Sequence, residues 1–115
     1  MDENEKKAEQ ETNLFLLQQK ARDYQDKFVQ LQNKEYQGKY QGVSIKEKGD
    51  GTVLEVHIDQ GFYETASKGQ IEIAIFKLAN NLHNAIVNDQ KSLQDELQID
   101  LSAFQKEHPF DNGNN

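Results

Sequence analysis

The sequence predicts an α+β protein with a long N-terminal helix, a β-hairpin forming a small antiparallel sheet, and a long second helix. Three observations predict this class: apolar residues at heptad spacing over 14–31, alternation of apolar and polar residues between 43 and 58, and helical spacing again from 71 onward. At 115 residues the chain suits one modest domain. We expect a polar segment at 1–11 that is either helical but solvated or frayed, a single domain at 12–97 and an irregular, partly disordered tail at 98–115.

The first predicted helix covers residues 12–35 and carries one apolar seam. Steps of three and four residues along the seam are typical of a coiled coil, in which a partner helix covers the seam. A lysine row, Lys20, Lys27 and Lys34, flanks it; at about 1.5 Å per helical residue the row spans ~21 Å. The partner is either a parallel helix of a second copy or the second helix of the same chain. The seam residues are Leu14, Leu17, Ala21, Tyr24, Phe28 and Leu31.

A hairpin is expected from Tyr36, because the period changes to two on both sides of the turn at 49–51. Gly38 and Gly42 in its first strand indicate a bulge or a close approach of the backbone. Two strands are marginal alone, so the hairpin needs a third strand, a helix or a second subunit to cover its apolar face.

The second helix is predicted to begin near Gln70, after a loop with a single turn around Phe62 and Tyr63. Its apolar stripe extends to Leu97, and Asp89 interrupts it. The first half of this helix is the more apolar, so we expect it to be buried on more than one side.

Composition limits the class of protein. The chain lacks cysteine, which excludes disulfides and thiolate chemistry, and it shows neither a signal peptide nor a run long enough to span a bilayer. We therefore expect a cytoplasmic protein without a membrane partner. Only 35% of the residues are apolar, which favours burial shared between two subunits of a homodimer.

Catalysis is not predicted. The three histidines are scattered without metal-ligand spacing, and Glu55 and Asp59 have no nucleophile or base nearby. The glycines at 49 and 51 belong to a turn and form no phosphate-binding loop. We expect no enzyme activity, no catalytic or metal-binding residues, no cofactor and no small-molecule substrate.

Charge is unevenly distributed along the chain. The formal net charge is -7, yet residues 14–48 hold seven basic and four acidic side chains, a balance of +3. Residues 51–115 hold four lysines and ten acids, a balance of -6. The acidic total opposes nucleic-acid binding, and the local positive segment weakens that objection.

Several segments occur in a fixed order: a glutamine-rich first helix, GVSI at 42–45, GDG at 49–51, VLEVHID at 53–59 and LANNL at 78–82. This order resembles the YbaB/EbfC family of bacterial nucleoid-associated proteins, over residues 12–95. The resemblance implies a tweezer-shaped homodimer in which hairpins join at the centre and helices project as arms. It also implies binding of double-stranded DNA, with little sequence preference, in the nucleoid.

The candidate DNA-binding residues are the basic side chains of the positive segment. The lysine row could contact phosphates, or its methylene stems could simply cover the apolar seam. Tyr36 and Tyr40 could stack on bases, but they suit an ordinary strand face better. The candidates are Lys20, Arg22, Lys27, Lys34, Lys39, Lys46 and Lys48.

Two functions remain as hypotheses. The first is a homodimeric, sequence-tolerant DNA-binding protein. The second is an acidic homodimeric adaptor of the same fold that holds another protein, for example in a secretion or conjugation system. The acidic second half and the acidic start of the chain motivate the second hypothesis.

Overall fold

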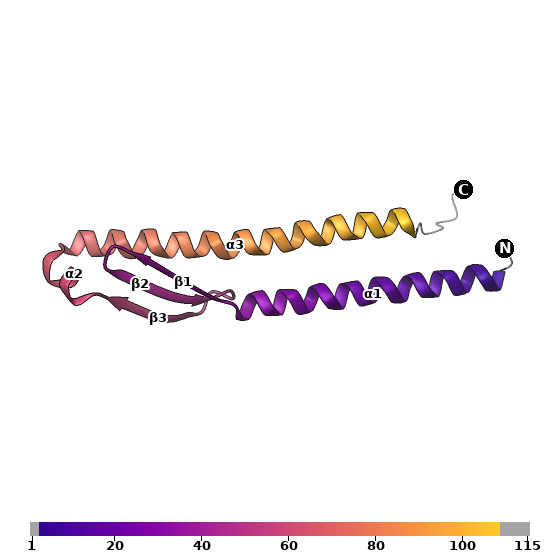
Figure 1. Ribbon diagram of the computed structural model, residues 1–115, viewed down its shortest axis with the longest axis horizontal. Helices are drawn as coiled ribbons and strands as arrows, with labels where there is room; N and C mark the ends of the chain where they lie inside the picture. The colour runs from indigo at the N-terminus through magenta and orange to yellow at the C-terminus, as the bar shows by residue number, and fades with distance from the viewer. Residues whose placement is uncertain (1–2, 109–115) are drawn as a thin grey trace. The chain divides into compact units, whose positions relative to one another are not determined.

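The computed structural model describes residues 3–108 (Figure 1). Within them, a three-stranded antiparallel sheet of order β1-β2-β3 lies between two long helices in the sequence. The predicted α+β class and the order of long helix, antiparallel strands and long helix are confirmed. The elements are α1 (Glu3–Asn33), β1 (Glu35–Tyr40), β2 (Val43–Lys48), β3 (Val53–Ile58), α2 (Gln60–Thr65) and α3 (Lys68–Glu107).

The chain divides into two compact units. The first, which we call the arm, contains residues 3–28 and 92–108 of the described part of the chain. The second, which we call the body, contains residues 29–91. Residues 12–97, expected to form one domain, contribute to both units.

The two long helices extend beyond their predicted bounds. α1 begins at Glu3, so the polar start of the chain is helical and exposed from that residue on. α3 continues to Glu107, and the prediction of an irregular segment is therefore wrong for 98–107. Leu101 and the buried Phe104 continue the apolar stripe there, which gives the helix a packing face. The rest of the predicted tail, 109–115, lies outside the described residues.

The sheet has one strand more than the predicted hairpin. The segment read as a single first strand folds back at Gln41 and Gly42, so that Tyr40 pairs with Val43. Gln41 adopts a positive φ of 52° in this tight turn. Gly42 is required by close approach: a Cβ on it would lie 2.2 Å from the Cβ of Phe62. The expected close approach of the backbone at this glycine is confirmed.

The turn between β2 and β3 packs against the C-terminal end of α1. The amide of Gly49 donates to the carbonyl of Lys34 (2.9 Å), and that of Asp50 to the carbonyl of Gln32 (3.1 Å), which satisfies acceptors near the helix end. A Cβ on Gly49 would lie 1.8 Å from the Leu31 carbonyl oxygen. Gly51 adopts a positive φ of 91° in this turn.

Local capping positions the last two helices. The Asp59 carboxylate accepts from the Phe62 amide (3.2 Å) and caps α2, where a single turn was predicted. Ser67 and Gln70 form a reciprocal capping box at the start of α3, with bonds of 3.1 Å and 2.8 Å.

The core of the body lies between α3 and one face of the sheet (Figure 1). α3 is centred over β1 and β2: Leu78 and Leu82 approach Gly38, and Val43 is fully buried. β3 is the strand farthest from α3 in Figure 1, and its Val56 is 54% exposed. The buried core residues are Tyr36, Val43, Ile45, Ala74, Leu78, Leu82 and Ile86.

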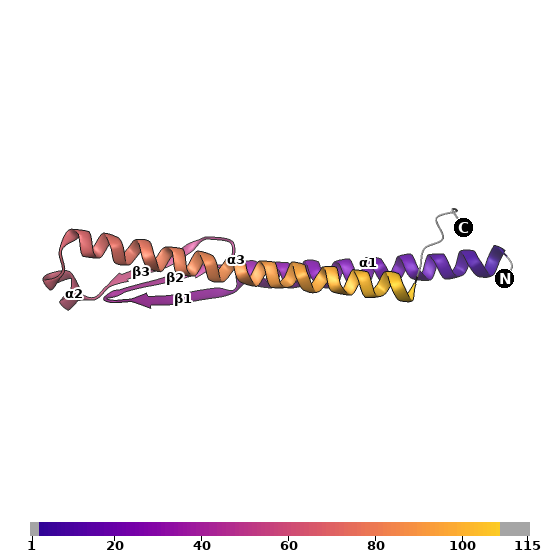
Figure 2. The ribbon, with the colours of Figure 1, turned by 90° about the horizontal axis from the view of Figure 1, so that it is seen from above.

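In the arm, α1 packs antiparallel against α3 of the same chain (Figure 2). The intramolecular alternative for the apolar seam therefore holds. Tyr24, Leu93 and Phe104 are buried, whereas Leu14 is 52% exposed and Ala21 is exposed. One helix thus covers only part of the predicted seam.

Candidate functional site: the lysine row and its carboxylate partners

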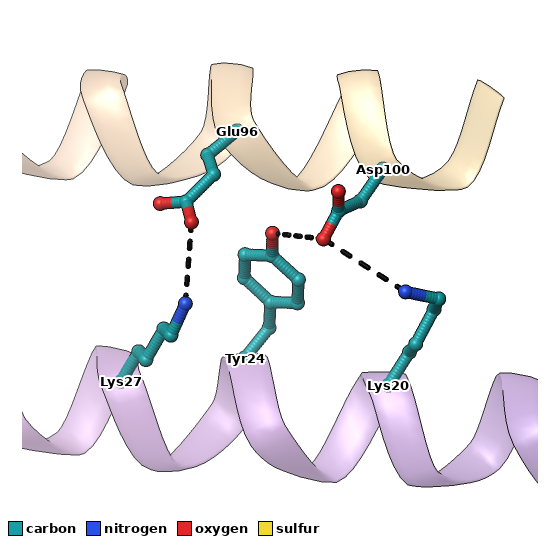
Figure 3. Close-up of polar contacts among 5 residues, drawn as sticks. All are labelled: Lys20, Tyr24, Lys27, Glu96 and Asp100. Carbon is teal, nitrogen blue, oxygen red and sulfur yellow. Dashed lines mark hydrogen bonds and ion pairs between the residues drawn. The ribbon is translucent and has the colours of Figure 1, made fainter. Parts of the chain in front are cut away.

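In the arm, two lysines of the lysine row, Lys20 and Lys27, meet carboxylates on α3 (Figure 3). The Lys27 ammonium lies 3.2 Å from Glu96 Oε1, and the Lys20 ammonium lies 3.9 Å from Asp100 Oδ2. The two lysine side chains are 47% and 36% exposed. They are therefore surface ion pairs that solvent can reach.

Tyr24 lies between these two pairs and fixes one of the carboxylates. Its hydroxyl donates to Asp100 Oδ2 at 2.7 Å, and Lys27 Nζ lies 4.8 Å from its ring centroid (Figure 3). The hydrogen bond to Asp100, followed by burial and the charges of Asp100 and Glu96, raises the pKa of Tyr24 to about 12. The phenol consequently stays protonated and donating at neutral pH.

The body contains a second lysine, tyrosine and aspartate group. Asp89 accepts from the Tyr36 hydroxyl (2.6 Å) and from the Lys34 ammonium (2.9 Å), which also lies 4.9 Å from the Tyr36 ring centroid. Burial first, then the hydrogen bond to Asp89, raises the pKa of Tyr36 to about 12. The bond from Tyr36, then that from Lys34, lowers the pKa of Asp89. Lys34 lies just past the end of α1, outside the helix on which it was predicted.

The remaining candidate residues are less engaged. Lys46 lies 3.9 Å from the Glu35 carboxylate. Across residues 3–108, no carboxylate lies within 4.0 Å of Arg22, Lys39 or Lys48. Lys39 and Lys46 alternate with core-facing residues, so they lie on the sheet face opposite α3. The seven candidates do not form one cluster.

Sequence reasoning missed the carboxylates that meet the lysine row. In the sequence pattern Asp89 only interrupts the apolar stripe, and nothing in that pattern marks Glu96 or Asp100. A signal for two of them is present, since Asp89 and Glu96 are seven residues apart, the spacing of the lysines. The same spacing of opposite charges on two antiparallel helices favours pairing between them.

A groove of about 500 Å³ runs along the partly covered seam of the arm. Its walls are almost entirely apolar, and it lies between α1 and α3, because residues of both helices line it. Such a surface fits the apolar face of another helix. The lining residues are Leu17, Ala21, Tyr24, Gln25, Phe28, Leu97 and Leu101.

Over residues 3–108 the structure places no three His, Asp or Glu side chains together in a way that could hold a metal ion. In the same range, no helix combines the length and apolar character that crossing a membrane requires.

No protein-family model matches the chain, and no curated protein matches it. A solved structure that does match is the crystal structure of the uncharacterized protein HP0035 from Helicobacter pylori. The TM-score is 0.60 at 18% sequence identity, and the match covers 85% of this chain and 98% of that chain. The likeness shows a shared α+β fold.

Proposed function

We propose that this chain is a non-enzymatic, homodimeric protein of the bacterial nucleoid that binds double-stranded DNA with little sequence preference. The resemblance of its ordered segments to the YbaB/EbfC family supports this proposal. The observation that carries it is the accessibility of the lysine row: Lys20, Lys27 and Lys34 have side chains 36%, 47% and 52% exposed, although each meets a carboxylate.

Ion exchange would make these lysines available to phosphate. Exposed ion pairs contribute only about 0–1 kcal/mol, so a phosphate can replace a carboxylate at small cost. The tyrosine rings beneath Lys27 and Lys34 keep both ammonium groups positioned while the partner changes. The displaced carboxylates still repel DNA, which keeps the affinity moderate.

A salt titration of duplex binding tests the proposal. If the three lysines of each subunit contact phosphate, a dimer neutralises roughly six phosphates, and log K should fall with log salt at a slope near -5. A slope near zero, or no binding at low salt, would refute it.

Removing one competing carboxylate provides a sharper test. In Glu96→Gln, Lys27 loses its carboxylate partner. Because this removes ~0.5 kcal/mol of competing ion-pair free energy in each of the two subunits, we expect DNA affinity to rise about fivefold. Glu72→Gln is the matched control, because Glu72 pairs with Lys68 on the exposed surface of the body. Equal affinities of the two variants would argue against phosphate contact at Lys27.

A second candidate is the adaptor function, and the apolar groove of the arm favours it. An amphipathic helix of another protein would fill this groove. Ala21→Glu should then abolish copurification of a partner at fixed ratio, because it puts a charge on the groove wall. Replacing Lys20, Lys27 and Lys34 together by Gln separates the two functions: unchanged DNA retention would favour the adaptor.

A further inference from the structure

One face of the arm, over residues 14–28 of α1 and 94–105 of α3, holds no charged side chain. It contains the apolar groove, and five of its residues line that groove. On α1 this face consists of Leu14, Gln18, Ala21, Gln25 and Phe28, which recur at steps of four and three residues. On α3 it consists of Gln94, Leu97, Leu101 and Gln105. None of the nine is buried, and we call them the uncharged face.

The ion pairs of the arm lie on the other side of the helix pair. Lys27 follows Gln25 by two residues, a rotation of about 200° around α1. Glu96 follows Gln94 in the same way on α3, and it pairs with Lys27 at 3.2 Å. In a chain with 29% charged residues, the charges are thus confined to one side of this stretch. Depletion of charge is typical of the core of a protein–protein interface.

The chemistry of the uncharged face suits a second copy of the same face. In a two-fold association the same patch lies on both subunits, so each group near the axis must tolerate its own counterpart. Two ammonium groups or two carboxylates repel each other there, whereas a glutamine amide both donates and accepts and can bond to another glutamine. The rims of the groove therefore carry the polar residue that a self-pairing surface can use.

The spacing of the apolar residues on α1 defines a centre for this pairing. Ala21 lies midway between Leu14 and Phe28, seven residues from each. When two α1 helices pack antiparallel about a two-fold axis at Ala21, Leu14 of each copy meets Phe28 of the other. Leu14 is 52% exposed and Phe28 is half-buried, so both gain cover. Ala21 has the smallest side chain of the groove wall and lets the two helices approach closely.

We propose that the uncharged faces of two copies pack together, α1 against α1 and α3 against α3, in an antiparallel four-helix arrangement with its two-fold axis at Ala21. This contact is separate from the homodimer of the proposed function, which the family resemblance expects at the hairpins. Lys20 and Lys27 stay outside it, on the opposite side of each arm. The inference rests on the proposed function for its consequence alone: two paired arms present their lysines on opposite sides and hold two DNA duplexes.

Paired charge variants test the contact, because like charges at the axis repel and opposite charges attract. Ala21→Glu and Ala21→Lys each set two like charges face to face, and each should sediment at half the wild-type mass in analytical ultracentrifugation. Both new residues are good helix formers at an exposed position, so the arm stays helical. An equimolar mixture of the two variants should regain the wild-type mass. Ile99→Glu is the control, because Ile99 is 70% exposed outside the groove, and it should keep the wild-type mass.

Three results would overturn the proposal: a wild-type chain no heavier than Ala21→Glu, a mixture that stays at half the mass, or a control as light as the charge variants. The first two would leave the groove to the helix of another protein.

Disulfide formation tests the position of the axis, since the chain contains no cysteine. Ala21→Cys places two thiols across the axis and should give a covalent dimer on a non-reducing gel after mild oxidation. Ile99→Cys should remain a monomer on the gel. No cross-link at residue 21, or equal cross-linking of both variants, would refute the axis. Association is measured without DNA, so a covalent Ala21→Cys dimer that fails to bind DNA at low salt would refute the proposed function and leave this inference standing.

Discussion

Removal of the Tyr36 hydroxyl is predicted to destabilise the body in a pH-dependent way. Tyr36 is 8% exposed, and its hydroxyl donates to Asp89 at 2.6 Å. A hydrogen bond to a charged group contributes about 1.5–3 kcal/mol. Asp89 has a side chain 38% exposed and retains Lys34 at 2.9 Å, so the lower end applies. We expect Tyr36→Phe to reduce the free energy of unfolding by about 1.5 kcal/mol at pH 7.

The pH dependence follows from the two shifted groups. The pKa of Tyr36 is raised from 10.0 to about 12, so its contribution is complete below pH 10 and is lost as pH rises towards 12. The pKa of Asp89 is lowered, so its contribution is present above the unfolded value near 4 and is lost as pH falls through the folded value. The difference between wild type and variant should thus be constant near neutrality and shrink at both extremes.

Urea unfolding followed by circular dichroism at several pH values provides the measurement. Tyr63→Phe is the matched control, because this tyrosine is 61% exposed. It should change the free energy of unfolding by less than about 0.5 kcal/mol at every pH. A Tyr36→Phe effect no larger than that of the control, or one that does not change between pH 7 and pH 12, would refute the reasoning.

Three further stability predictions concern packing and capping, each measured by urea unfolding. Val43→Ala should destabilise the body by about 2–3 kcal/mol, because it opens a cavity at a fully buried position; less than ~0.5 kcal/mol would contradict the core described above. Ser67→Ala should cost about 1 kcal/mol through loss of the capping box, and Ser67→Asp should restore most of it. Gly49→Ala should lower the free energy of unfolding by about 3 kcal/mol, because the added Cβ would meet the Leu31 carbonyl. Gly61→Ala is the control: its Cβ would lie 3.3 Å from the Asp59 carboxylate, and it should leave the free energy of unfolding nearly unchanged.

The elements with a regular period could be predicted from the sequence. Heptad spacing and strict alternation identified both long helices and the strands of β2 and β3, because each pattern matches one backbone geometry. β1 was merged with β2, since EYQGKY has no apolar alternation and its turn uses Gln41 at positive φ. Pairing with β2, and the close approach of Leu78 and Leu82 to Gly38, place β1 in the sheet. The end of α3 was missed because Leu101 and Phe104 were not read as a continuation of its stripe.

The sequence predicted the lysines of the candidate site but not the carboxylates that they meet. The lysine row was evident from its spacing, but the electrostatic state of each lysine depends on side chains 55–80 positions away in the sequence. Asp89 illustrates the difficulty: in a one-dimensional stripe it breaks an apolar face, whereas in the body it accepts hydrogen bonds from Lys34 and Tyr36. A polar residue within the apolar stripe of a helix can form hydrogen bonds with polar side chains of a facing element. A residue that interrupts such a stripe should therefore be compared with hydrogen-bond donors that recur at the same spacing elsewhere in the sequence.

The exposed apolar residues of both units have a common physical origin. A helix stripe wider than about 100° needs more than one neighbour to cover it. Among residues 3–108, α3 packs against α1 in the arm and against the sheet in the body, so within each unit one neighbour covers it. In the arm, Leu14 and Phe15 are 52% and 60% exposed; in the body, Phe76 is 68% exposed on α3. Burying such side chains contributes roughly 1.5–3 kcal/mol each, far more than a surface ion pair. Association through apolar surface would therefore supply most of the binding energy of any assembly, and the lysines would decide which charged partner it accepts.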